Sequence, residues 1–378
     1  MTKYFERLRN AQATLAQTVA LQNGNLENYN PSKALYTIRR EERPIVGQSQ
    51  QMRVLFYLLN IYAKNNENVL ILGNSGTGKE LAAKALHYNS PRYQPGIGNF
   101  VVINCSSIPE SLIESELFGY TRGAFTGAEK TGRLGAFHRA AGGTIVLDEI
   151  ADMPFHLQPR LLRVVEEKKI KKVGGDEYID LGETKIVAST NRDLVQLVRE
   201  GTFRHDLLQR LSVLPLYTPT ILERGRDEIT ILINYFATGS TQPSEAISPD
   251  ALKTVMQLSL PGNVRTLENL IKQAKVLGNG RVTGESLTAA VPYIEAQDAA
   301  SPSSYDQLFN SGSTIADATI QESAQPNTLN LELIERWAIE RALKISFGIQ
   351  REAAELLGIT PRILSYKVAK LKEKSETK

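Results

Sequence analysis

Residues 73–79, Gly-Asn-Ser-Gly-Thr-Gly-Lys, constrain the fold of this chain more than any other stretch. They follow an apolar run, residues 69–72, and precede a helix-like segment. A glycine-rich loop in this position is typical of a Walker A motif, in which backbone N–H groups and the next helix N-terminus bind phosphate. Lys79 is then placed to reach the β- and γ-phosphates. The predicted nucleotide contacts begin with Gly73, Asn74, Ser75, Gly76, Thr77, Gly78 and Lys79.

The surrounding sequence predicts an α/β fold with a parallel sheet. Four short apolar runs, residues 69–72, 100–103, 144–147 and 185–188, are separated by helix-like stretches. Continuous apolar runs of this length suit strands that are buried on both faces of a parallel sheet. Residues 221–295 lack such runs and predict a small helical bundle. A Gly-Gly pair within residues 171–177 indicates a hairpin.

The run at 144–147 ends in two acids, Asp148 and Glu149, which is the Walker B arrangement. We expect Asp148 to hold Mg²⁺ and Glu149 to polarise the water that attacks ATP. Two solvated acids at a strand end are the simpler alternative. The phosphate loop at this spacing favours the catalytic interpretation.

The composition is that of a globular protein with two or three domains. The chain has 378 residues, of which 42% are hydrophobic and 22% charged, and its net charge is only +3. Any DNA contact must therefore come from a local patch. A single cysteine, Cys105, excludes an intrachain disulfide and fits a reducing cytoplasm. The first residues lack the apolar run of a signal peptide, and no stretch reaches the length of a membrane span, so we expect a cytoplasmic protein without a membrane span.

Composition shifts divide the chain into five parts. We expect an N-terminal arm at 1–44, an α/β core at 45–220, a helical lid at 221–295, a flexible linker at 296–328 and a DNA-binding domain at 329–378. Within the arm, residues 4–22 have the apolar spacing of an amphipathic helix. This helix packs on its own chain, or it contacts a second subunit or a regulator.

The C-terminal part has the pattern of a helix-turn-helix. Residues 349–367 read as helix, turn at Gly358 and helix, with Thr360 as the N-cap and Pro361 at the first helical position. The second helix is expected to enter the major groove of double-stranded DNA. An apolar face beginning at Leu331 forms a dimer contact or an internal core, and a helical protein-binding tail is the alternative for the whole segment. The candidate DNA-binding residues are Arg351, Arg362, Ser365, Tyr366 and Lys367.

One further loop, residues 123–128, lies between the phosphate loop and the acidic pair, and its sequence is Gly-Ala-Phe-Thr-Gly-Ala. With these motifs, residues 45–295 and the last fifty or so resemble the bacterial sigma-54-dependent transcription activators, whose AAA+ ATPase domain carries this GAFTGA loop and whose C-terminal domain is Fis-like. The resemblance implies that the loop contacts sigma-54, with Phe125 and Thr126 at its tip. The implied contact residues are Gly123, Ala124, Phe125, Thr126, Gly127 and Ala128.

The same resemblance assigns further roles. Asn104 holds the catalytic Glu149 inactive until nucleotide binds, Asn191 senses the γ-phosphate, and Arg265 touches nucleotide from the lid. Arg204 and Arg210 correspond to arginine fingers that reach a neighbour's γ-phosphate, which implies a homo-oligomeric ring, a hexamer in this family. Glu80, in place of the usual Ser or Thr, is typical of this family. Three residues depart from its pattern: Leu222, Leu260 and Thr266.

Two other functions are weighed against an ATP-driven activator of sigma-54 RNA polymerase. One is a DNA-binding regulator that only binds nucleotide, and the other is an AAA+ remodeller of another substrate, such as a replication-initiator-like ATPase. The complete catalytic set argues against the first and the GAFTGA sequence against the second. Residues 1–44 are too few for a folded sensory domain, so we expect a regulatory protein acting in trans, as in phage-shock-type activators, or control by expression level.

Overall fold

The computed structural model describes residues 6–12, 14, 29–39, 43–90, 93, 99–124, 131–299 and 364. Met1–Asp298 form one compact unit and Ala299–Lys378 a second. The predicted linker and helix-turn-helix lie outside the described residues, apart from the first few positions of the former and one residue of the latter.

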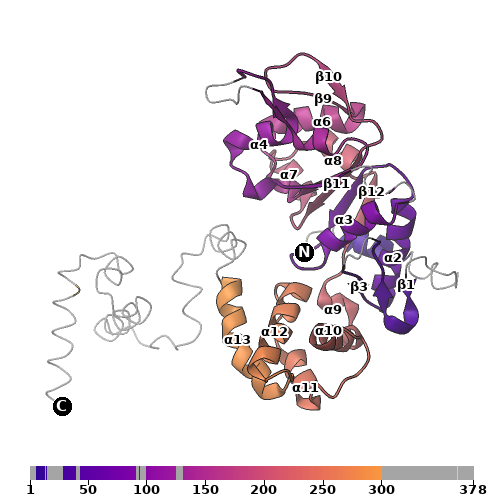
Figure 1. Cartoon of the computed structure of the whole chain (residues 1–378), viewed down its shortest axis with the longest axis vertical. Helices are drawn as coiled ribbons and strands as arrows, with labels where there is room; N and C mark the ends of the chain where they lie inside the picture. The colour runs from indigo at the N-terminus through magenta and orange to yellow at the C-terminus, as the bar shows by residue number, and fades with distance from the viewer. Residues whose placement is uncertain are drawn as a thin grey trace. The chain divides into compact units, whose positions relative to one another are not determined.

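A five-stranded parallel sheet is the centre of the first unit (Figure 1), and it confirms the predicted fold class. Its order is β12-β4-β11-β8-β5. The four predicted apolar runs correspond to the three inner strands, β4, β11 and β8, and to the edge strand β5. Each is a continuous apolar segment, as a strand of a parallel sheet requires. The strands are β4 (Val69–Leu72), β5 (Phe100–Asn104), β8 (Thr144–Asp148), β11 (Lys185–Thr190) and β12 (Leu214–Tyr217).

Strand β12 was not expected from the sequence. It contains Pro215, which lacks a backbone N–H, and prolines are tolerated only where a strand is hydrogen-bonded on one side. β12 satisfies this condition because it is an edge strand that pairs with β4 alone.

Helices cover both faces of the sheet, since successive residues of each strand point to opposite faces. In β4, Val69 and Ile71 join the core under α2 (Gln50–Ala63) and α3 (Lys79–Tyr88). Leu70 and Leu72 join the larger core on the other face. That face is covered by α4 (Glu110–Phe118), α5 (Ala136–Arg139), α6 (Gln158–Glu167), α7 (Leu194–Arg199) and α8 (His205–Leu211). Short 3₁₀ turns lie at Pro31–Lys33, Cys105–Ser107, Ile150–Asp152 and Phe155–Leu157.

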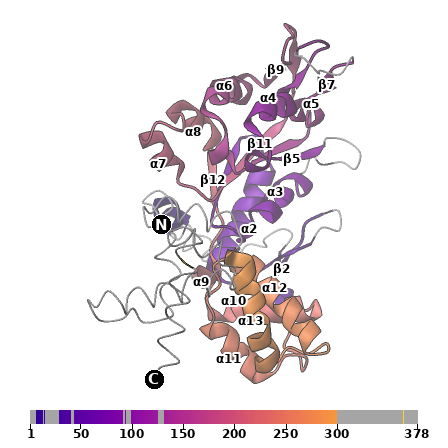
Figure 2. The ribbon, with the colours of Figure 1, turned by 90° about the vertical axis from the view of Figure 1, so that its left-hand side faces the viewer.

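The helical bundle predicted for residues 221–295 is present and has its own apolar core. Figure 2 shows its helices together below the sheet. They are α9 (Ile221–Arg224), α10 (Arg226–Thr238), α11 (Pro249–Gln257), α12 (Asn263–Leu277) and α13 (Gly284–Ala299). Among the described residues, no helix combines the length and the hydropathy that crossing a bilayer requires.

Three small antiparallel sheets complete the unit. The predicted hairpin is confirmed as β9 (Lys169–Lys171) paired with β10 (Tyr178–Asp180). A second pair, β6 (Gly119–Tyr120) and β7 (Arg133–Leu134), frames the GAFTGA segment. The third, which the sequence did not predict, joins β1 (Tyr29–Asn30), β2 (Leu35–Tyr36) and β3 (Ile45–Val46).

The described part of the N-terminal arm packs on its own chain. Residues 6–12 are helical. Leu8 packs against the larger core, Arg9 forms an ion pair with Glu223 at 3.1 Å, and Gln12 Oε1 accepts the backbone N–H of Tyr217 at 3.0 Å.

Candidate functional site

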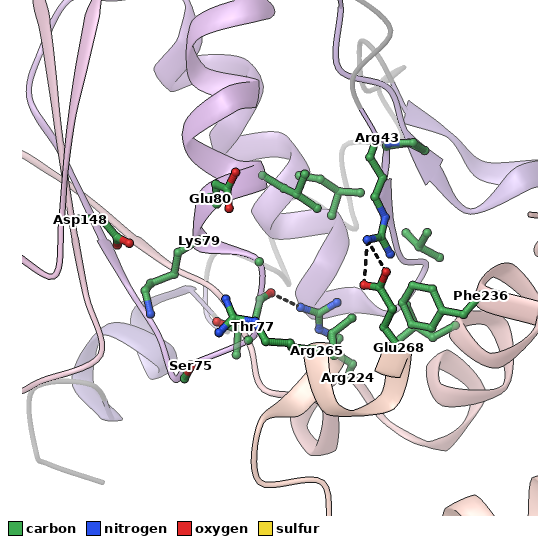
Figure 3. A pocket seen from close by; sticks show the side chains of 18 of the residues that line it. Arg43, Ser75, Thr77, Lys79, Glu80, Asp148, Arg224, Phe236, Arg265 and Glu268 are labelled. Atoms are coloured by element: carbon green, nitrogen blue, oxygen red, sulfur yellow. Dashed lines mark hydrogen bonds and ion pairs between the residues drawn. The ribbon is translucent and has the colours of Figure 1, made fainter. Parts of the chain in front are cut away.

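A cavity of about 300 Å³ lies between the carboxyl ends of the sheet strands and the lid, as Figure 3 shows. Ligands of open α/β sheets bind at this edge because loops from adjacent strands meet there. The cavity is lined by the phosphate loop, by the acidic pair and by lid residues. Of the predicted nucleotide contacts, those that line it are Ser75, Gly76, Thr77, Gly78, Lys79, Glu80, Asp148 and Arg265.

The phosphate loop has the backbone that its glycines predict. Gly76 and Gly78 have positive φ angles of 73° and 103°. A Cβ atom at Gly76 would lie 2.0 Å from the carbonyl oxygen of Gly262, so no larger residue fits there. Lys79 Nζ donates to Gly73 O at 2.9 Å. The loop therefore presents backbone donors and one ammonium group to the cavity, a combination that suits a phosphate chain.

The acidic pair at the end of β8 is held in place by β11. Ser189 Oγ donates to Asp148 Oδ1 at 2.6 Å, and Asn191 N donates to Glu149 Oε2 at 3.3 Å. Lys79 Nζ lies 3.8 Å from Glu149 Oε1. Both carboxylates thus face the phosphate loop across the cavity.

Burial shifts the pKa values of Glu149 and Lys79 in opposite directions. It raises the pKa of Glu149 above its usual range, against the opposing effect of the Lys79 ammonium. It lowers the pKa of Lys79, and the charges of Glu149 and Asp148 only partly compensate. A carboxyl group with a raised pKa is a better proton acceptor than an ordinary one, which is what a general base needs.

Lid residues brace the phosphate loop. Arg224 Nη2 donates to Thr77 O at 2.7 Å, and Asn263 Nδ2 donates to Ser75 O at 2.9 Å. Arg224 is buried, and burial lowers its pKa to about 10. Glu228 accepts the N–H groups of Gln48 and Ser49 at 2.7 and 2.8 Å, which ties α10 to the start of α2. Lid and core are therefore joined by hydrogen bonds at the predicted phosphate loop.

Three of these bracing residues were not identified from the sequence as functional. They are Ser189, Asn263 and Arg224, and none of them was assigned a role from the sequence. The signal for Asn263 was its place beside Arg265. Nothing near Arg224 in the sequence points to Thr77.

The far end of the cavity is apolar. Its lining comes from β3 and the residue before it, from α10 and from α12, and the side chains are Pro44, Ile45, Val46, Leu232, Phe236 and Val264. An aromatic base buries its faces well against such side chains, while the phosphates lie at the opposite, charged end. The cavity thus has the two chemical ends that a nucleotide requires.

The structure does not bring all the predicted catalytic residues to the cavity. Asn104 lines it, but its Oδ1 accepts from the N–H and the hydroxyl of Ser106, at 2.9 and 2.7 Å. Arg204 lies outside the cavity and pairs with Asp206 at 2.6 Å. Arg210 pairs with Glu166 at 2.8 Å, and 62% of its side chain is exposed. The roles of these three residues in catalysis stay predictions.

The base of the GAFTGA loop packs against the β9–β10 hairpin. Gly123 and Ala124 are described, whereas Phe125, Thr126, Gly127 and Ala128 lie outside the described residues. Thr121 N donates to Val173 O at 3.0 Å, and Val173 N donates to Gly119 O at 2.9 Å. The candidate DNA-binding residues Arg351, Arg362, Ser365, Tyr366 and Lys367 also lie outside the described residues.

Three protein-family models match consecutive parts of the chain. The Sigma-54 interaction domain matches residues 45–217, the AAA+ ATPase lid domain matches residues 223–303, and the model described as bacterial regulatory protein, Fis family, matches residues 330–371. The third match covers the segment where the sequence predicts a helix-turn-helix.

Curated relatives and a solved structure agree with these matches. The chain is 39% identical to nitrogen fixation protein VnfA of Azotobacter vinelandii, over 86% of this chain and 58% of VnfA. It is 38% identical to regulatory protein AtoC of Escherichia coli K12, over 81% of this chain and 63% of AtoC. It is 36% identical to the Nif-specific regulatory protein of A. vinelandii, over 98% of this chain and 67% of that protein. The chain therefore spans about three fifths to two thirds of the length of these relatives. The structure of NtrX from Brucella abortus in complex with ATP is similar, with a TM-score of 0.58 and 30% identity over 88% of this chain and 70% of NtrX.

Proposed function

Because this chain belongs to the family of sigma-54-dependent transcription activators, we propose that it couples ATP hydrolysis to remodelling of sigma-54 RNA polymerase. In this proposal the Fis-type domain binds double-stranded DNA at an upstream site, and the subunits assemble into a homo-oligomeric ring, a hexamer. The GAFTGA loop then contacts sigma-54. The observation that carries the proposal is the cavity that holds the phosphate loop, the acidic pair and the lid arginine together.

The cavity residues fit hydrolysis of ATP. Lys79 and the loop amides bind the β- and γ-phosphates. Glu149 orients a water molecule and accepts its proton as the water oxygen attacks the γ-phosphorus. The bond to the β–γ bridging oxygen breaks, and ADP and inorganic phosphate leave. Arg265 neutralises phosphate charge from the lid side.

The residues present also fit a magnesium ion. Among the described residues no cluster of three or more metal-binding side chains exists. Mg²⁺ does not need one, because it binds through one or two carboxylates together with water and substrate phosphates. When bound, it neutralises the charge that develops on the phosphate oxygens. Asp148 would hold it, and the Ser189 hydroxyl fixes the orientation of this carboxylate.

Two features support transfer of the nucleotide state to the GAFTGA loop. Asn104 ends β5, Glu149 directly follows the adjacent strand β8, and both line the cavity. The segment 119–124 then carries the loop, and the β9–β10 hairpin is bonded to its base. A change in how Asn104 and Glu149 interact when the γ-phosphate is bound would therefore move α4 and the loop that follows it.

Thr126→Ala tests the coupling between hydrolysis and remodelling. We expect the variant to hydrolyse ATP at close to the parent rate, because Thr126 is remote in sequence from every residue of the cavity. We expect it to form no open complex in an assay with sigma-54 RNA polymerase, promoter DNA and ATP. Thr131→Ala is the matched control, since it also removes a threonine hydroxyl but lies just outside the GAFTGA loop.

Open-complex formation by the Thr126→Ala variant at the parent level would contradict the proposal. A chain that only binds nucleotide is the alternative from a different functional class. Measurement of phosphate release from ATP separates the two, because that alternative predicts no release from the parent chain.

A further inference from the structure

Two charged side chains form an ion pair across the boundary between core and lid. They lie beside the apolar end of the cavity, where the nucleotide base is expected. Arg43 precedes β3 on the core side, and Glu268 belongs to lid helix α12. Arg43 Nη1 donates to Glu268 Oε1 at 2.9 Å and to Oε2 at 2.8 Å. Figure 3 shows this pair beside the apolar end of the cavity.

A third side chain, Phe236 of α10, extends the contact. The guanidinium carbon of Arg43 lies 5.1 Å from the centre of the Phe236 ring, within the range of a cation–π interaction. Arg43 thus contacts two lid helices at once, and all three side chains line the cavity. The Arg43 side chain is 40% exposed and the Glu268 side chain is 17% exposed, so the pair lies where the cavity meets solvent.

We infer that Arg43, Glu268 and Phe236 form a latch that holds the lid against the core and slows the release of nucleotide. The inference rests on the proposed function, because it assumes that the cavity binds ATP and ADP. A nucleotide bound there has its base behind these side chains, so it leaves fastest when Arg43 has separated from Glu268. The latch acts on binding and not on the chemical step, which takes place at the phosphate end.

The chain offers a matched control for this latch. Lys272, one helical turn from Glu268, pairs with Glu268 Oε1 at 2.6 Å, but it belongs to the lid itself and does not line the cavity. Lys272→Ala therefore removes one ion pair from the same carboxylate without removing a contact between lid and core.

The test measures the rate constant for dissociation of mant-ADP, a fluorescent analogue, from the purified full chain with Mg²⁺ by stopped flow. Arg43→Ala should raise it about five-fold, the scale expected for loss of a partly exposed ion pair with a cation–π contact, and Glu268→Ala, which leaves that contact in place, should raise it about three-fold. The double variant should be no faster than Arg43→Ala, because both changes break one interaction. Arg43→Lys should be intermediate, and Lys272→Ala should match the parent.

Three results would overturn the latch. They are release within two-fold of the parent for both single variants, additive effects in the double variant, and a Lys272→Ala effect as large as that of Arg43→Ala. Thermal melting of each variant shows whether it is folded. The assay contains neither sigma factor nor DNA, so unchanged release alongside normal open-complex formation would remove the latch and leave the proposed function intact.

Discussion

Glu149 has an unusual backbone as well as a shifted pKa. Its φ angle is 48°, in the left-handed region that costs a non-glycine residue about 1 kcal/mol or more. The turn directs the acid from the end of β8 toward Lys79, while Asn191 N binds its second oxygen. The strain is thus located at the one carboxylate that the proposed mechanism uses as a base.

The shifted pKa of Glu149 predicts the acid limb of the ATPase pH profile. The carboxylate is the active form, so activity is lost as the pH falls through the pKa of Glu149. Because burial raises this pKa, the loss should occur at a higher pH than for an ordinary glutamate, whose pKa is about 4.3. The measurement is kcat/KM for ATP between pH 5 and pH 8, where an unshifted glutamate is already about 80% ionised at pH 5 and almost fully ionised from about pH 6.

Glu149→Gln is the companion variant. It cannot accept a proton, and we expect its hydrolysis rate to be at least roughly 100-fold below that of the parent at pH values above the pKa of Glu149. A parent profile that stays flat down to the range of an unshifted glutamate would show that this carboxyl group does not control the reaction.

Residues that line the cavity could be predicted from the sequence when a local motif contains them. Lys79, Asp148 and Glu149 each lie within a short pattern whose chemistry is known. Ser189 and Arg224 do not, because their partners, Asp148 and Thr77, are 41 and 147 residues away in the chain. Such contacts arise only when the sheet and lid have formed.

At the scale of elements, the β9–β10 hairpin and the base of the GAFTGA loop form one packed contact. The turn residue Gly174 has a φ angle of 72°, and a Cβ atom there would lie 3.0 Å from both Ala124 Cβ and Thr121 Oγ1. The hairpin therefore limits where the loop base is able to lie. Movement of one requires adjustment of the other.

Gly174→Ala tests this contact. The added methyl group crowds Ala124, so we expect open-complex formation to fall by roughly ten-fold, equivalent to about 1.4 kcal/mol. ATP hydrolysis should stay within two-fold of the parent, since the hairpin does not line the cavity. Gly182→Ala is the control, because Gly182 also has a positive φ angle, 56°, but nothing lies within 4 Å of its added methyl group.

Equal losses in the two glycine variants would mean that backbone strain, and not contact with the loop, is responsible. A selective loss in Gly174→Ala would assign the effect to the packing of Gly174 on Ala124.

Strands could be predicted from the sequence where burial on both faces gives a continuous run of apolar residues. β4, β8 and β11 are buried on both faces and appear as uninterrupted apolar runs. β12 contains a proline and lies at an edge, so no run marks it. β1, β2 and β3 have two residues each, too few for any periodicity, although Tyr36 of β2 is fully buried against Phe56.

At the scale of the whole molecule, the residues predicted to be catalytic are divided between the cavity and the surface. Arg204 and Arg210 belong to α8 and its N-cap, outside the cavity lining of their own subunit. Arginine fingers that stabilise transition-state charge are supplied in cis or in trans. This placement is the one expected if they complete the site of a neighbouring copy.

Mixing of two inactive variants tests the shared site. Lys79→Ala and Arg204→Ala subunits should each be inactive alone. In an equal mixture an Arg204→Ala subunit next to a Lys79→Ala subunit has an intact site, so about one half times one half, or a quarter, of the interfaces should recover activity. Steady-state phosphate release measures this.

The control mixture combines Lys79→Ala with Glu149→Gln. Both changes affect the half of the site that one subunit supplies, so no interface is intact and no activity should return. Failure of the first mixture to exceed this control would count against arginine fingers in trans.

The hydrogen bond between Gln12 and the edge strand has a consequence for how copies of this chain are able to associate. In β12, alternate N–H groups point toward β4, and the two that point outward belong to Pro215 and Tyr217. Proline has no N–H, and Gln12 Oε1 occupies that of Tyr217. The outer border of the sheet therefore offers no free donor along this strand, and a second chain cannot extend the sheet there by backbone pairing. Association through this edge must therefore use side chains, while the opposite edge of the sheet is formed by β5.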